Sequence, residues 1–220
     1  MRRLTPQGST MNANTIINEE PTTKDWPSNL IFWLKKIPIT FWIFLANLLM
    51  YCYTAILSQN FIIIDIWVQE LFGISGESYN AGRYFVFITA MFVHQDLLHL
   101  GLNLFSLAVI GIVFESRRGR TNFLIIYFLA GLTTNLLSLL LFPQWTFVGA
   151  SAAIFGIAGA TIMRLMDSVV FGSLFILALF AMAPPMSFLS HGIGAVVGVV
   201  TDYFLKKRTN KKNQTTRNKS

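Results

Sequence analysis

The chain has 220 residues, of which 54% are hydrophobic and 12% are charged, and its formal net charge is +7. Soluble domains carry about 25% charged residues, so this composition excludes an ordinary soluble globular protein and indicates a polytopic membrane protein. The single cysteine, Cys52, excludes a disulfide framework, and we interpret it as a small packing residue in an apolar segment.

The first 28 residues are polar and include three acidic side chains. They lack the apolar core of a signal peptide, and their acidic residues argue against a transit peptide. We therefore expect residues 1–28 to form a disordered cytoplasmic tail. A transmembrane domain is expected over residues 29–206, followed by a basic cytoplasmic tail over residues 207–220.

Six apolar segments approach the length of about 20 residues that a membrane span requires. We predict spans near residues 39–58, 97–115, 121–142, 147–163, 168–184 and 187–205. The fourth and fifth have about 17 residues each, which is close to the lower limit. Most connections are short and favour neighbouring up-and-down helices. The prediction is an all-α polytopic membrane protein with six transmembrane helices.

The positions of lysine and arginine predict the orientation of these helices. Basic residues precede the first span, lie between the second and third and between the fourth and fifth, and follow the sixth. Both termini should therefore be cytoplasmic. Seven basic residues follow Asp202, and they favour contact with anionic membrane lipids over nucleic acid because they adjoin a span.

The first connection, residues 59–93, is long and apolar. Its apolar run is interrupted by Asp65 and Glu70, so it is a poor membrane span. We expect this loop to be embedded in the outer interface of the membrane, with Trp67 and Phe72 among the lipids.

Polar side chains gather at the start of the second span. His99 and Asn103 are four residues apart and share a helix face. His94 is five residues before His99, about 140° away, and should point toward the preceding loop. A pair of zinc-binding histidines on a helix is usually four residues apart, so we predict neither a metal nor another cofactor.

Ser151 and His191 lie in two segments rich in small residues. A lone serine in a membrane helix is more often a packing residue than a nucleophile. Here, however, glycines and alanines surround both side chains, so the two helices can approach to backbone contact. At 1.5 Å per residue, His99, Ser151 and His191 lie about 5 to 7 Å below the outer ends of their spans, and Asn103 about 11 Å.

This layer of polar groups fits nucleophilic catalysis. A serine hydroxyl needs a base to accept its proton, and His191 is the candidate at the right depth. His99, the Asn103 amide and the Ser151 backbone N–H can donate hydrogen bonds to an oxyanion. No acidic residue is expected nearby, so the arrangement is a dyad and not a Ser-His-Asp triad.

These residues resemble those of the rhomboid family of intramembrane serine proteases. The resemblance covers about residues 33–206 and implies a six-helix bundle with an embedded first loop. It is carried by His94-x4-His99-x3-Asn103, Gly149-Ala150-Ser151, His191 followed by Gly194, and Gly111-Ile112-Val113-Phe114-Glu115 with Gly119.

The family pattern implies a role for each matching residue. Ser151 would be the nucleophile and His191 the base. His99 and Asn103 would line the oxyanion hole, and His94 would be a structural or auxiliary group. The substrates implied are single-span transmembrane proteins that are cut near the outer membrane face.

Phe155, one turn after Ser151, matches an aromatic residue that packs on the catalytic histidine. The chain departs from the family pattern at Ala152, where glycine is usual, at Phe85-Val86, where Trp-Arg is frequent, and at Ser190, where alanine is more usual.

Two other functions fit part of the pattern. A catalytically inactive rhomboid-like protein would bind membrane proteins without cutting them, and it would usually lack the serine or the histidine. A small transporter would need ionisable residues along a path through the membrane. We expect a bacterial cytoplasmic (inner) membrane as the location, with an organelle as the alternative; the pattern specifies no oligomeric state.

Overall fold

The computed structural model of the chain describes residues 38–162 and 185–217. Within these ranges the regular secondary structure is helical, apart from two isolated β-bridges. The predicted N-terminal tail, residues 1–28, and the predicted fifth span, residues 168–184, lie outside the described residues. The all-α prediction is confirmed for the described part of the chain.

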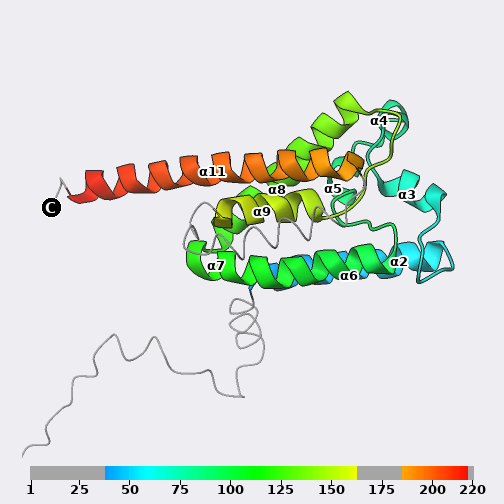
Figure 1. Cartoon of the computed structure of the whole chain (residues 1–220), viewed down its shortest axis with the longest axis horizontal. Helices are drawn as coiled ribbons and strands as arrows, with labels where there is room; N and C mark the ends of the chain where they lie inside the picture. The colour runs from blue at the N-terminus through cyan, green and yellow to red at the C-terminus, as the bar shows by residue number, and fades with distance from the viewer. Residues whose placement is uncertain (1–37, 163–184, 218–220) are drawn as a thin grey trace, which may run out of the picture. The chain divides into compact units, whose positions relative to one another are not determined.

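Four of the described helices are long and apolar enough to cross a membrane, and they match the predicted first, second, third and sixth spans (Figure 1). They are α2 (Ile39–Leu57), the continuous helix of α6 (Leu97–Ser106), η2 (Leu107–Gly111) and α7 (Ile112–Arg118), then α8 (Arg120–Leu141), and the segment Phe188–Lys211 of α11 (Pro185–Arg217). α11 therefore continues as a helix into the basic residues that we predict as a tail.

The predicted fourth span, residues 147–163, begins later in the structure, because α9 (Ser151–Ile162) starts at Ser151. The chain before α9 is held by another segment. The backbones of Phe147 and Ile74 exchange two hydrogen bonds, of 2.9 and 3.0 Å. A backbone group that is bonded to a distant segment is not available to a helix, which explains the later start.

The second membrane helix contains one π-helical turn, η2, between α6 and α7. A π turn adds one residue and so changes the phase of the helix by about 100°. In an unbroken α-helix, Glu115 would lie about 120° away from Asn103. The extra residue brings both polar side chains close to the same face, and both are buried.

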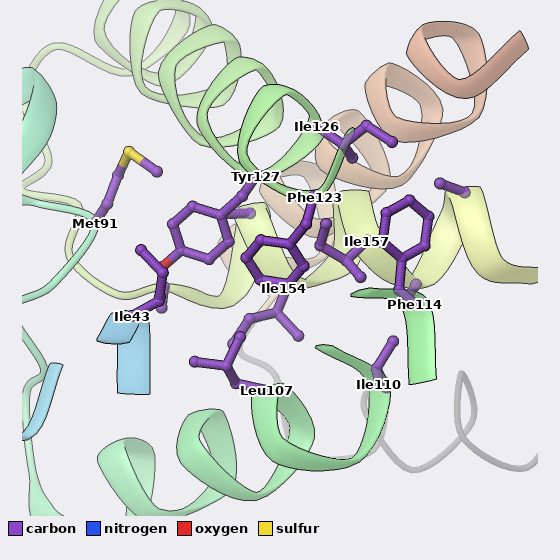
Figure 2. Packing of buried hydrophobic residues seen from close by; sticks show 14 residues of the cluster. Ile43, Met91, Leu107, Ile110, Phe114, Phe123, Ile126, Tyr127, Ile154 and Ile157 are labelled. Atoms are coloured by element: carbon purple, nitrogen blue, oxygen red, sulfur yellow. The ribbon is translucent and has the colours of Figure 1, made fainter. Parts of the chain in front are cut away.

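The largest cluster of buried apolar side chains joins α2, η2, α7, α8 and α9 (Figure 2). Near its centre, the rings of Phe123 and Tyr127 are stacked, with centroids 5.8 Å apart and planes 13° apart. Lipid tails are as apolar as these side chains, so close packing and not exclusion from water holds such helices together. This cluster fixes α9, which carries Ser151, against the second and third spans.

Glu115 caps the start of α2, which has no side-chain cap of its own. Its carboxylate accepts hydrogen bonds from the backbone N–H groups of Ile39 and Thr40, at 2.8 and 2.9 Å, and from the Thr40 hydroxyl at 2.8 Å. The first N–H groups of a helix have no partner within it and carry partial positive charge, so a carboxylate is the favoured acceptor. The glutamate thus ties the end of the second predicted span to the start of the first.

We expect Glu115→Ala to lower the free energy of unfolding by about 3 kcal/mol, because it leaves buried donors of α2 without an acceptor. Glu115→Gln keeps one acceptor oxygen and should lose about half as much. Thermal unfolding of the purified protein in detergent measures both. Equal melting temperatures for the wild type and Glu115→Ala would contradict the capping role.

The first connection is folded and contains three short helices, α3 (Ile66–Phe72), α4 (Gly76–Asn80) and α5 (Val86–Thr89). Apolar side chains at the start of α3 are more than half exposed: Ile66 at 72% and Trp67 at 52%. Phe72 is partly exposed and packs edge-on against Tyr53 of α2, with ring centroids 5.8 Å apart. It therefore anchors the loop to α2, and its place among the lipids stays a prediction.

Candidate active site

Ser151 is the first residue of α9, so its backbone N–H lies among the unpaired donors at a helix start. Gly149, two residues earlier, has a φ of 121°, which L side chains rarely adopt. Its N–H donates a 2.8 Å hydrogen bond to the Ala90 carbonyl in the first connection. The glycine and this bond together set the direction in which the chain enters α9.

His191 lies on α11 and reaches Ser151 directly. Its Nε2 atom is 2.9 Å from the Ser151 Oγ atom, across 40 residues of sequence. The imidazole ring stacks on Phe155 of α9, with centroids 4.3 Å apart and planes 8° apart. Ser190, where the family usually has alanine, lies with its Oγ 3.4 Å from that of Ser138 on α8.

Glycines allow α9 and α11 to approach this closely (Figure 1). A Cβ atom added at Gly194 would lie 2.2 Å from the Ala152 carbonyl oxygen, and one at Gly198 would lie 1.9 Å from that of Gly156. No side chain fits at these distances. The predicted contact between two small-residue faces is therefore present, with backbone against backbone.

His99 lies beside Gly149 and so borders the pair. A Cβ atom at Gly149 would lie 2.9 Å from His99 Cε1, 3.0 Å from His99 Nε2 and 3.7 Å from Ser151 Oγ. The backbone N–H of His99 donates to the Asp96 carboxylate at 2.7 Å, which caps α6. The Nε2 edge of the imidazole lies beside Gly149, in the loop that leads into Ser151.

Asn103 is buried one turn further along α6. Its Nδ2 donates a 2.8 Å hydrogen bond to the His99 carbonyl oxygen, which leaves one amide hydrogen for another acceptor. Within the part of the chain that the structure describes, its side chain has no hydrogen bond to Ser151 or His191. The structure thus brings Ser151, His191 and Phe155 into direct contact, places His99 beside them, and holds Asn103 through the backbone of His99.

His94 is fully buried in the loop before α6. Its Nδ1–H donates to the Phe92 carbonyl at 3.1 Å, as expected for a side chain that points toward the preceding loop. Its ring also meets that of His99 edge to face, with centroids 5.1 Å apart, a contact that the 140° offset did not predict. Burial, together with the nearby His99, lowers the pKa of His94 to about 3, so this histidine is neutral at physiological pH.

The sequence analysis did not predict the contacts of three acidic residues. Asp96 caps α6 at His99, Glu115 caps α2, and Asp202 pairs with Arg118. The first has a sequence signal, since an aspartate three residues before the capped N–H is a typical helix start. The other two act across more than 70 residues, and no local pattern predicts them.

We expect Gly149→Ala to lower the rate at which Ser151 reacts with a fluorophosphonate by about 10²-fold, the loss that a displacement near 1 Å can cause. The methyl group would press against His99 at a backbone angle that alanine rarely adopts. The matched control is Gly101→Ala on α6, where an added Cβ meets nothing within 4 Å. Equal rates for both variants would contradict this geometry.

The chain is similar to known proteins of one family. The model of the Rhomboid domain matches residues 81–208. "Rhomboid-like protease 3" of Toxoplasma gondii is 32% identical over 156 residues, which are 69% of this chain and 58% of that protein. "Rhomboid-like protein 11, chloroplastic" of Arabidopsis thaliana is 28% identical over 198 residues, which are 79% of this chain and 67% of that protein.

A shorter match is to "Inactive RHOMBOID-like protein 8" of Arabidopsis thaliana, 35% identical over 78 residues, or 36% of this chain and 22% of that protein. This chain thus spans 58% of the length of the Toxoplasma relative and less of some others. The family model covers more than half of the chain, and the Toxoplasma relative aligns with more than two thirds of it. The chain therefore belongs to the rhomboid family.

Proposed function

We propose that the chain is an intramembrane serine endopeptidase that hydrolyses peptide bonds of single-span transmembrane proteins near the outer membrane face. The observation that carries this proposal is the 2.9 Å contact between Ser151 Oγ and His191 Nε2. A packing serine needs no imidazole at this distance, whereas a nucleophile needs a base within hydrogen-bond reach.

The reaction follows from the donors and acceptors around Ser151. Its hydroxyl donates to His191 Nε2, and as Oγ attacks the substrate carbonyl carbon, His191 takes the proton. His191 then gives this proton to the leaving amine, which leaves an acyl group on Ser151. A water molecule, deprotonated by His191, hydrolyses the ester and restores the serine.

The negative oxygen of the tetrahedral intermediate needs preorganised donors. The Ser151 backbone N–H is available at the start of α9, and His99 presents its Nε2 edge beside Gly149. Asn103 contributes the amide hydrogen that is not bonded to the His99 carbonyl. We assign these three donors to the oxyanion hole.

Two further side chains support the imidazoles. Phe155 stacks on His191 and keeps its Nε2 atom directed at Ser151, a role that a carboxylate fills in a triad. His94 is an auxiliary residue, because its ring is locked by the Phe92 carbonyl and packs against His99. Neither side chain takes part in bond making.

The proposal is tested by reaction with a fluorophosphonate and by cleavage of a single-span substrate in proteoliposomes. Mass spectrometry should locate the phosphonyl group on Ser151, and the cut should map near the outer boundary of the substrate helix. A folded preparation that is unlabelled at Ser151 and leaves the substrate intact would overturn the proposal.

The second candidate is an inactive rhomboid-like protein that binds membrane proteins. Ala152 favours it, because this residue departs from the family glycine directly after Ser151, and one relative is named inactive. We nevertheless expect Ala152→Gly to leave the rate of phosphonylation within about tenfold of the wild type, since alanine adds only a methyl group to glycine. A gain far above tenfold would show that Ala152 suppresses activity and would favour the binding role.

We further propose that both termini face the cytoplasm and that the membrane is a bacterial cytoplasmic membrane, with an organelle as the alternative. The basic residues of the loops and of the end of α11 support the orientation. Ser151, His191 and the oxyanion hole would then lie near the outer face of the membrane. The orientation is tested by fusing to the C-terminus a reporter that fluoresces only in the cytoplasm. A fusion protein that is expressed normally but does not fluoresce would contradict a cytoplasmic C-terminus.

A further inference from the structure

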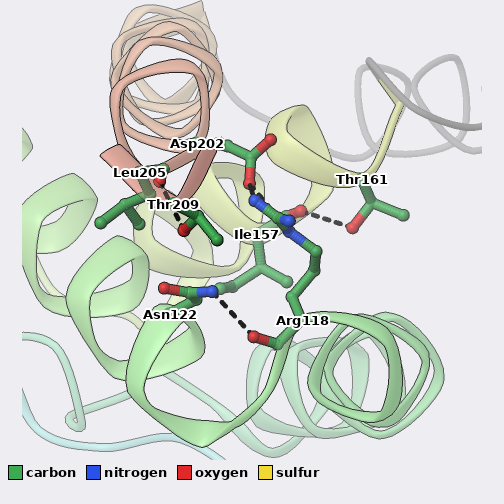
Figure 3. Close-up of polar contacts among 7 residues, drawn as sticks. All are labelled: Arg118, Asn122, Ile157, Thr161, Asp202, Leu205 and Thr209. Atoms are coloured by element: carbon green, nitrogen blue, oxygen red, sulfur yellow. Dashed lines mark hydrogen bonds and ion pairs between the residues drawn. The ribbon is translucent and has the colours of Figure 1, made fainter. Parts of the chain in front are cut away.

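A buried ion pair joins the cytoplasmic ends of the second and sixth predicted spans (Figure 3). The Nε and Nη2 atoms of Arg118 lie 3.1 and 2.5 Å from the same carboxylate oxygen of Asp202. Their side chains are only 20% and 6% exposed. Asn122 of α8 donates a 2.8 Å bond to the Arg118 carbonyl and so holds the turn that carries the arginine.

Stability alone does not explain this pair. Removing two charges from water is unfavourable, and apolar residues of similar size often stabilise a protein as well as a buried ion pair does. Buried charges are better attested as devices that select one register between helices. Asp202 is the only acidic residue of α11, so the pairing admits a single register.

The contact between α9 and α11 needs such a device. It is made by backbone against backbone at Gly194 and Gly198, and by Gly159 of α9 against Ala195. Faces of small residues let helices come close, but they present few side chains that interlock and resist sliding. The ion pair, with two nitrogens of a planar guanidinium on one oxygen, has a defined direction and distance.

We propose that Arg118 and Asp202 are positioning residues, whose ion pair sets the axial position of α11 and thereby the distance from His191 to Ser151. This inference rests on the proposed proteolytic function. Asp202 follows His191 by eleven residues on one continuous helix, a distance of about 16 Å. If α11 shifts along its axis at Asp202, His191 therefore shifts by the same distance. A displacement near 1 Å can lower the rate of a catalysed reaction by about 10²-fold.

The test compares the wild type with Asp202→Asn, with Arg118→Gln and with the exchanged pair Arg118→Asp/Asp202→Arg. Inactivation by a fluorophosphonate at several concentrations separates the reversible affinity from the rate constant of bond formation. Both single variants should lower that rate constant about 10²-fold with the affinity within threefold, and the exchanged pair should recover most of the loss. The matched control is Arg117→Gln, an exposed neighbour, which should react like the wild type.

The variant Leu107→Ala distinguishes positioning from a general loss of stability, because it truncates a buried apolar side chain of η2 and leaves both charges in place. At equal melting temperature, Asp202→Asn should react far more slowly than Leu107→Ala. Equal rates at matched stability, or a rate for Asp202→Asn within threefold of the wild type, would overturn the inference. Should the exchanged pair not fold, Asp202→Glu keeps the charge and should react faster than Asp202→Asn.

A second readout does not depend on activity. Spin labels at Val196→Cys on α11 and Leu136→Cys on α8, both exposed positions, report the axial position of α11 in a Cys52→Ser background. Asp202→Asn should shift or broaden the distance distribution, and an unchanged distribution would refute the positioning role. If the fluorophosphonate does not react with Ser151 of the wild type, the proposed function is refuted instead, whatever distances the spin labels report.

Discussion

His191→Ala should lower both phosphonylation of Ser151 and cleavage of a transmembrane substrate by at least about 10³-fold. The hydroxyl of serine is a weak nucleophile at neutral pH, and His191 Nε2, 2.9 Å away, is the base that contacts it. Loss of the base from serine proteases lowers the rate by several orders of magnitude, with residual catalysis from the oxyanion hole. The measurement is the rate of labelling and of peptide release in proteoliposomes.

The matched variant is Phe155→Leu, which removes the ring stacked on His191 but leaves the base in place. It should slow the reaction by about tenfold, because the imidazole is then less well oriented, and the loss should be far smaller than that of His191→Ala. A His191→Ala variant that is labelled as fast as the wild type would show that Ser151 reacts without this base. The dyad would then have to be abandoned.

Gly198→Val should have the largest effect on the fold. A Cβ atom at this position would lie 1.9 Å from the Gly156 carbonyl oxygen, and backbone atoms on both helices cannot yield as a flexible side chain can. α9 and α11 must separate, so we expect a loss of more than about 3 kcal/mol in stability and at least a 10²-fold loss of activity. Thermal unfolding and the rate of labelling measure the two losses.

Gly192→Ala is the matched control for stability, because it lies on the same helix and an added Cβ meets nothing within 4 Å. It should leave the melting temperature unchanged or slightly higher, since alanine is the better helix former. If Gly198→Val has the same melting temperature as the wild type and Gly192→Ala, α9 and α11 are not in backbone contact at Gly198. Comparing the two variants therefore tests this contact and not the general cost of replacing a glycine in a helix.

The spans and the candidate residues were accessible from the sequence because both depend on local patterns. An apolar run of about 20 residues predicts a membrane helix wherever it lies, and four such runs match helices of the described part. The spacing of His99 and Asn103 placed them on one face of a helix, and small residues around Ser151 and His191 predicted close approach. Local periodicity did not predict η2, which moves Glu115 by about 100° around its helix.

Local patterns in the sequence were enough to predict an all-α membrane protein, its apolar spans, and a serine and histidines that could act together. The distance of 2.9 Å between Ser151 and His191, the start of α9 at Ser151, and the pairing of Asp202 with Arg118 emerge from the packed helices alone. The two groups of features differ in the range of the interactions behind them. Apolar length and helical spacing act over a few residues, whereas a proton transfer or an ion pair depends on atoms whose relative positions are set by the packing of entire helices.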